Sequence, residues 1–72
     1  MQTIMKKTIK WRQIRTQLGT AYISEDGRFQ IYYVHQPYNT HYVLLDNGAS
    51  IYTDAVLLEC QQMAEHRKQL YN

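Results

Sequence analysis

Residues 20–35 read TAYISEDGRFQIYYVH and carry the strongest local structural signal in the chain. Two runs rich in tyrosine, isoleucine and other strand-forming residues flank the turn Glu25-Asp26-Gly27. An aspartate followed by glycine tolerates the positive backbone φ that a tight hairpin turn requires, and runs of this composition on both sides favour strands. The stretch therefore predicts a β-hairpin, and the rest of the fold is built outward from it.

Further strand patterns continue the sheet on both sides of this hairpin. Residues 8–14 alternate partially between apolar and polar side chains, which indicates a strand. Residues 36–40 interrupt the pattern with proline and asparagine, and residues 41–46 resume it. An Asn-Gly pair then turns the chain toward a short strand at residues 50–52.

One amphipathic helix follows, which we predict from Thr53 to Leu70. Thr53 suits an N-cap, and Asp54 suits the first turn, where a carboxylate favours the positive end of the helix dipole. Apolar residues recur there at spacings of three and four: Val56, Leu57, Cys60, Met63, Ala64, Leu70 and Tyr71. The sequence thus predicts one α+β domain over residues 1–72, in which an antiparallel meander of three to four strands packs on a C-terminal helix.

Size and composition narrow the functional class. A chain of 72 residues forms a thin core, and its single cysteine cannot close an intramolecular disulfide. A reducing cytosol suits such a protein, so we expect a cytoplasmic location. The longest apolar runs, residues 42–45 and 55–58, are far too short to span a bilayer, and no export signal precedes them.

The charges are unevenly distributed although the net charge is only +2. Five basic residues precede Glu25, the first acidic residue: Lys6, Lys7, Lys10, Arg12 and Arg15. Residues 1–7 are a candidate for a disordered basic arm, and the whole basic segment is a candidate for contacts with nucleic-acid phosphates. The alternative is an ordinary solvated strand whose cations deter edge-to-edge aggregation.

The two sides of the predicted sheet follow from the loop at residues 36–40. If these five residues form the loop, His35 opposes His41 and Tyr33 opposes Val43. The side toward the helix then carries Phe29, Ile31, Tyr33, Val43 and Leu45. The opposite side carries Ile23, Arg28, Gln30, Tyr32, Val34, Tyr42 and Leu44.

This second side is more apolar than a monomer usually exposes to water, so we predict that these seven residues bind a partner. The alternative is that Trp11 and the N-terminal segment fold back and cover it within the same chain.

Catalytic and ligand-binding patterns are sparse. His35 and His41 flank one loop, but two imidazoles are an incomplete metal site. Cys60 falls on the apolar side of the helix, where a thiol is usually an inert core residue. The glycines are isolated turn residues and form no phosphate-binding loop. We therefore expect no enzymatic activity, no metal, no cofactor and no small-molecule substrate.

The order of the motifs resembles small uncharacterised proteins of phages and mobile elements. Trp11, Tyr22, the run SEDGRFQI at residues 24–31 and the run YVLLD at residues 42–46 carry this resemblance, together with a Thr-led helix that contains Glu59-Cys60 and Ala64-Glu65-His66. Strands followed by a helix also resemble the three-stranded DNA-binding modules of the AP2 type and of tyrosine-recombinase N-terminal domains. Those modules carry several basic residues on the sheet, whereas the side described above has only Arg28.

Two functional hypotheses follow. The first is a protein-binding module whose partner is a second copy or, as the mobile-element resemblance implies, a host protein that it inhibits or adapts. The second is nucleic-acid binding through Lys6, Lys7, Lys10, Arg12 and Arg15, with Tyr32 or Tyr42 stacking on bases.

Overall fold

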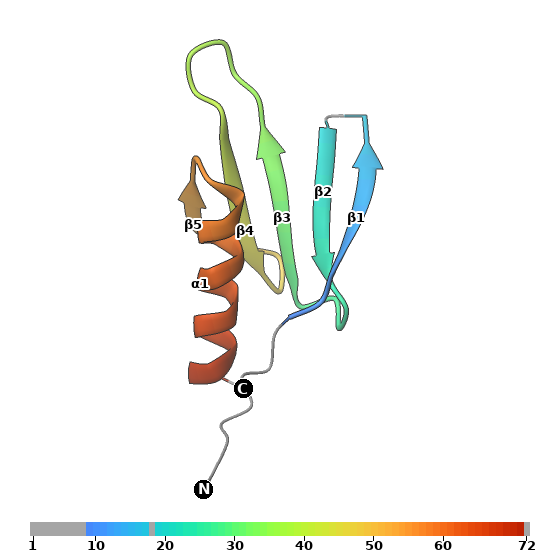
Figure 1. The fold of residues 1–72 in the computed structure, drawn as a ribbon, viewed down its shortest axis with the longest axis vertical. Coiled ribbons are helices and arrows are strands. Elements are labelled where there is room, and N and C mark those ends of the chain that lie inside the picture. The colour runs from blue at the N-terminus through green and yellow to red at the C-terminus, as the bar shows by residue number, and fades with distance from the viewer. Residues whose placement is uncertain (1–8, 18, 72) are drawn as a thin grey trace, which may run out of the picture.

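The computed structural model describes residues 9–17 and 19–71, which form one antiparallel sheet and one helix (Figure 1). The strands follow one another in space in the order of the chain, so the sheet is a meander. The elements are β1 (Trp11–Thr16), β2 (Gly19–Ser24), β3 (Phe29–Val34), β4 (His41–Asp46), β5 (Ala49–Asp54) and α1 (Leu57–Leu70). The predicted α+β class, the antiparallel sheet and the C-terminal helix are confirmed, and the sheet has five strands rather than three to four.

The hairpin of β2 and β3 forms where the sequence predicts it. Ser24 and Asp26 stabilise its turn, because the Ser24 hydroxyl donates to the Asp26 carboxylate at 2.8 Å and the Arg28 amide donates to the same oxygen at 3.0 Å. Gly27 adopts a φ of +80°, the left-handed conformation that glycine tolerates best. The turn chemistry therefore fixes β2 against β3.

The helix begins later than predicted. Thr53 and Asp54 belong to β5, where they pair with Val43 and Tyr42 of β4, and α1 starts at Leu57. Asp54 instead supports the turn between the two elements, since its carboxylate accepts the Val56 amide at 2.9 Å. The residues typical of a helix N-terminus thus end β5 three residues before the helix begins, because pairing with β4 continues through Asp54.

Helix α1 lies over one side of the sheet and over only part of its width (Figure 1). It contacts β3, β4 and β5, and none of its described residues packs closely on β1 or β2. The core between them contains Phe29, Ile31 and Leu44 from the sheet with Cys60 and Ala64 from α1, all completely buried. Ile9, just before β1, completes the same cluster.

A buried carboxylate joins the sheet to the end of the helix. Asp46 is 8% exposed and accepts hydrogen bonds from Arg28 at 2.9 and 3.2 Å and from Arg67 of α1 at 2.6 Å. The Arg28 guanidinium also donates to the Tyr71 carbonyl at 3.3 Å. Hydrogen bonds from Arg28, and then from Arg67, lower the pKa of Asp46 despite its burial. The network fastens the C-terminal end of α1 to β4.

Among the residues that the structure describes, no helix is both long and apolar enough to cross a membrane.

Candidate functional site

The strand register decides which residues lie on the side of the sheet away from α1. Ile31 of β3 pairs with Leu44, and both are buried under the helix. Residues directly opposite each other share a side of the sheet, and neighbours along a strand alternate. The outer side is therefore defined by these residues, which we call the open face: Arg12, Ile14, Thr16, Ala21, Ile23, Gln30, Tyr32, Val34, His41, Val43, Leu45, Ser50 and Thr53.

The open face is organised in rows across the strands. The middle row runs from β1 to β5 as Ile14, Ala21, Tyr32, Val43 and Thr53. The row nearer the β2–β3 turn runs as Arg12, Ile23, Gln30, Leu45 and Ser50. The third row includes Val34 opposite His41. Apolar side chains thus occupy the centre, polar ones lie largely at the edges, and none of the open-face residues is acidic.

Tyr32 stands at the centre of this face. It is 39% exposed, more than any other large hydrophobic residue in the five strands. Its hydroxyl donates a hydrogen bond to the Gln30 side-chain oxygen at 3.1 Å. The tyrosine therefore presents a ring whose polar end is already paired within the chain, which lowers the cost of burying it against a partner.

The predicted partner-binding set is partly correct in its placement. Ile23, Gln30, Tyr32 and Val34 lie on the open face as expected. Tyr42 and Leu44 were assigned to it wrongly, since they pair with Tyr33 and Ile31 and lie toward α1. Leu44 is completely buried, and Tyr42 packs against the core.

Val43 and Leu45 take the places that the prediction gave to Tyr42 and Leu44. The cause is a shift of one residue in register, because His41 pairs with Val34 rather than with His35. A shift of one residue moves every side chain of a strand to the other side of the sheet. The loop between β3 and β4 is accordingly longer by one residue than the five assumed from the sequence.

Arg28 was also wrongly placed on the open face. It precedes β3, and its guanidinium bonds to Asp46, which lies on the α1 side. The Arg28 guanidinium therefore binds Asp46 and does not line the open face.

Trp11 does not cover the open face either. It pairs with Ser24, which places it on the α1 side, and it packs against the core cluster. The same alternative placed the N-terminal segment over this face, and residues 1–8 of that segment lie outside the described part of the chain.

The basic residues do not gather on one surface. Lys6 and Lys7 lie outside the described residues. Arg12 pairs with Ile23 on the open face, whereas Arg15, three residues along the same strand, pairs with Thr20 and lies on the α1 side. The described part of the predicted phosphate-binding set is thus divided between the two sides of the sheet.

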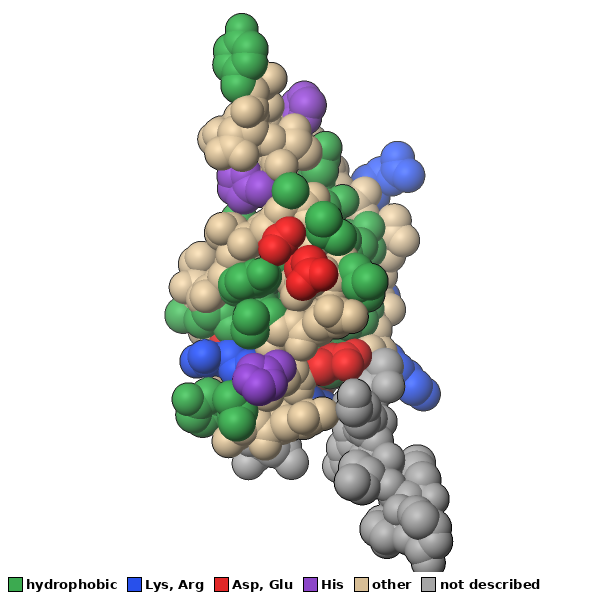
Figure 2. Space-filling view, turned by 60° about the vertical axis from the view of Figure 1, so that its left-hand side comes forward, with side chains coloured by type: hydrophobic (Ala, Val, Ile, Leu, Met, Phe, Trp, Pro, Cys, Tyr) green, Lys and Arg blue, Asp and Glu red, His purple; other side chains and the backbone are tan. Residues whose placement is uncertain are grey.

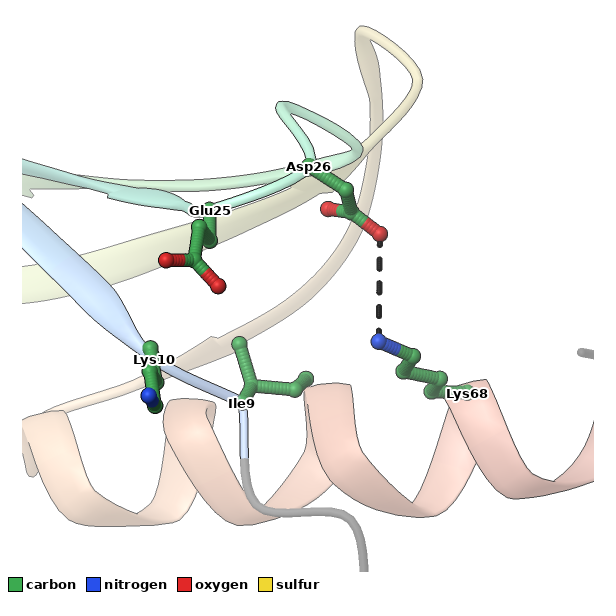
Figure 3. A pocket seen from close by; sticks show the side chains of 5 residues that line it. All are labelled: Ile9, Lys10, Glu25, Asp26 and Lys68. Carbon is green, nitrogen blue, oxygen red and sulfur yellow. Dashed lines mark ion pairs between the residues drawn. The ribbon is translucent and has the colours of Figure 1, made fainter.

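Lys10 borders a shallow hollow between the start of β1, the β2–β3 turn and α1 (Figure 3). Its lining mixes both signs of charge, and Lys68 lies 3.8 Å from the Asp26 carboxylate. The volume is about 130 Å³, whereas ligand pockets usually measure roughly 300–1,000 Å³. The hollow has neither the size nor the net charge to hold an anionic or drug-sized ligand.

Exposed apolar residues also occur outside the open face. On the side shown in Figure 2, hydrophobic side chains are interspersed with acidic, basic and histidine side chains. The exposed apolar residues around α1 are split between its two ends, with Val56 and Leu58 at one and Leu70 and Tyr71 at the other. Tyr38 is fully exposed in the loop between β3 and β4, and this loop projects beyond the strands (Figure 1).

Groups with catalytic or metal-binding chemistry are dispersed or buried. Cys60 is completely buried, and burial raises the pKa of its thiol to about 11. His35 Nδ1 lies 3.3 Å from the Thr40 hydroxyl within its own loop. Within residues 9–17 and 19–71, no cluster of three or more His, Cys, Asp or Glu side chains is placed to hold a metal ion.

Searches of protein-family models, of curated proteins and of solved structures find no match to this chain.

Proposed function

We propose that this protein is a small non-enzymatic binding module that recognises a protein partner through the open face. One observation carries the proposal. A five-stranded sheet is covered by a helix on one side, while the other side presents an apolar centre around the exposed Tyr32.

The composition of the open face suits a protein rather than a nucleic acid. Protein interfaces are depleted in charge at their centre and enriched in aromatic residues, with polar groups at the rim. Tyr32, Val34, Val43 and Leu45 supply such a centre, and Arg12, Ser50 and Thr53 lie on the two edge strands. A surface that binds phosphates needs several cations on one side, and Arg12 is the only lysine or arginine among the open-face residues. A host protein that the module inhibits or adapts is one form of such a partner.

The test is capture of partners from cell lysate with and without nuclease treatment, followed by direct binding of each captured protein in purified form. The wild type is compared with Tyr32→Ala and with the matched control Leu58→Ala, because Leu58 is 56% exposed on α1. We expect Tyr32→Ala to weaken binding at least tenfold, as truncation of a central interface aromatic usually does. The control should bind like the wild type.

Two results would contradict the proposal. Unchanged binding by a folded Tyr32→Ala variant would exclude the open face as the interface. Capture that disappears on nuclease treatment and weakens steeply with added salt would favour nucleic-acid binding instead.

A further inference from the structure

We infer that the occupant of the open face is a second copy of this chain, packed sheet against sheet in a symmetric dimer. The inference rests on the proposed function, because it names the partner of the same surface. In such a dimer the two sheets lie about 10 Å apart with their strands roughly aligned, and each helix α1 lies on the outside. The open faces become the interior of a β-sandwich.

A symmetric face-to-face dimer would bring no like charges together on this surface. A two-fold axis parallel to the strands lays β1 of one copy over β5 of the other, so Arg12 meets Ser50 of the same row. A two-fold axis across the strands lays β1 over β1 with the rows reversed, so Arg12 meets Thr16 at the other end of the strand. In both arrangements the two Arg12 side chains stay apart. The face therefore brings together no opposing like charges when it meets itself.

The centre of the face also matches its own copy. In both arrangements the middle row lies over the middle row, so Tyr32 and Val43 pack against an apolar surface, while Ala21 of the same row is already completely buried within the chain. The Tyr32 hydroxyl brings its own acceptor, Gln30, and does not need one from the partner. A partner rich in charge would leave its own groups unpaired against this centre, whereas the middle row of a second copy brings no charged side chain to it.

The size of the face is sufficient for a weak dimer. Five strands at a spacing of about 4.8 Å and six residues at about 3.3 Å give a plane of roughly 20 by 20 Å, or about 400 Å². Side-chain relief enlarges the accessible area, so two copies bury on the order of 1,000 Å² in total, the lower bound for a specific interface. We therefore expect a concentration-dependent dimer with a dissociation constant in about the micromolar range.

The edges of the sheet are less suited to joining two copies. β1 carries Arg12 and Arg15, and two such strands side by side would bring four cations together. β5 is irregular, because its register against β4 shifts between Leu44 and Leu45. Bulges and edge cations both oppose continuation of a sheet, so the open face is the favoured route of self-association.

The test is sedimentation equilibrium of the wild type from about 1 µM to 1 mM, a range that brackets a micromolar dissociation constant. The apparent mass should rise from 8.6 kDa toward twice that value. Tyr32→Lys places two ammonium groups in the dry centre and should weaken dimerisation at least a hundredfold. Leu58→Lys adds the same charge on α1 and should leave the dissociation constant unchanged, with circular dichroism confirming that both variants fold.

A measurement on the wild type keeps the inference testable if Tyr32→Lys does not fold. Isotope-filtered NOEs in a mixture of labelled and unlabelled protein should connect methyl groups of Ile23, Val43 and Leu45 between copies. NOEs from α1, or from β1 and β5 alone, would overturn the inference, as would a wild type that stays monomeric to 1 mM, far above a micromolar dissociation constant.

The outcomes separate this inference from the function on which it rests. A monomeric wild type whose binding to another protein falls in Tyr32→Ala overturns only the second-copy inference. A dimer that persists in folded Tyr32→Lys, together with unchanged binding by Tyr32→Ala, overturns both.

Discussion

The two sides of the sheet carry apolar residues on the same strands and differ in what covers them. On the α1 side, Phe29, Ile31 and Leu44 are completely buried, and Asp46 joins the sheet to the helix through two arginines. On the open face, Tyr32 is 39% exposed and no carboxylate is present. The difference indicates that the α1 side supplies most of the stability of the domain, whereas the described residues leave Tyr32 of the open face partly exposed.

The largest effect expected from this comparison separates two adjacent leucines of β4. Leu44→Ala removes a completely buried side chain and should lower the free energy of unfolding by about 2–5 kcal/mol. Leu45→Ala removes a partly exposed one and should lower it by about 1 kcal/mol in the monomer. Urea denaturation of dilute protein measures both.

The register of β4 is tested by comparing how much Leu44→Ala and Leu45→Ala each lower the free energy of unfolding. A larger loss for Leu45→Ala would show that β4 presents its other side to α1, as the sequence alone had suggested.

The sequence of β4 alone does not determine which side of this strand faces the helix. Residues 42–45 read YVLL and are apolar on both sides of the sheet, so alternation cannot say which side meets the helix. Only the length of the loop before His41 sets the register, and a loop without a two-residue turn motif leaves that length open. The hairpin of β2 and β3 was predictable because Asp26 and Gly27 specify the turn itself.

Long-range pairing explains the other differences. Thr53 and Asp54 have the local chemistry of a helix start, but backbone pairing with β4 keeps them in β5. Arg28 and Gln30 are two residues apart and would share a side of a regular strand. The partner of Arg28, however, is Asp46, which lies on the neighbouring strand on the α1 side. The Asp46 network was missed altogether, since its three members lie 18 and 21 residues apart and no local pattern connects them.

The next largest effect concerns this buried carboxylate, which has no counterpart on the open face. Asp46→Asn removes the charge that Arg28 and Arg67 share and should lower the free energy of unfolding at pH 7 by on the order of 1–3 kcal/mol. Glu25→Gln removes the same charge from an exposed turn residue and should change it by less than about 0.5 kcal/mol.

The same variant should change the response of stability to acid. The hydrogen bonds from Arg28 and Arg67 lower the pKa of Asp46 in the folded state. The ionised Asp46 therefore makes its full contribution to the free energy of unfolding above about pH 5, where the unfolded chain is also ionised. This contribution is lost as the pH falls through the lower folded pKa. Chemical denaturation at a series of pH values should show a shallower loss below pH 4 for Asp46→Asn. Equal slopes for variant and wild type would contradict this account, while Asp26 and Asp54, whose pKa values are also lowered, leave a residual slope in both.

The smallest perturbation compares thiols on the two sides of the sheet. Val43→Cys replaces the two methyl groups of one partly exposed side chain by a thiol and should lower the free energy of unfolding by about 1 kcal/mol or less. An alkylating reagent at pH 8 should add one label to the native variant and none to the native wild type, because burial raises the pKa of the Cys60 thiol to about 11 and the reactive thiolate is scarce. In urea the variant should take up two labels and the wild type one, as intact mass spectra would show. Rapid labelling of native Cys60 would contradict the buried core.

If the open face meets a second copy, the label on native Val43→Cys should also form more slowly as the protein concentration rises, whereas a rate independent of concentration would show that this face stays in water.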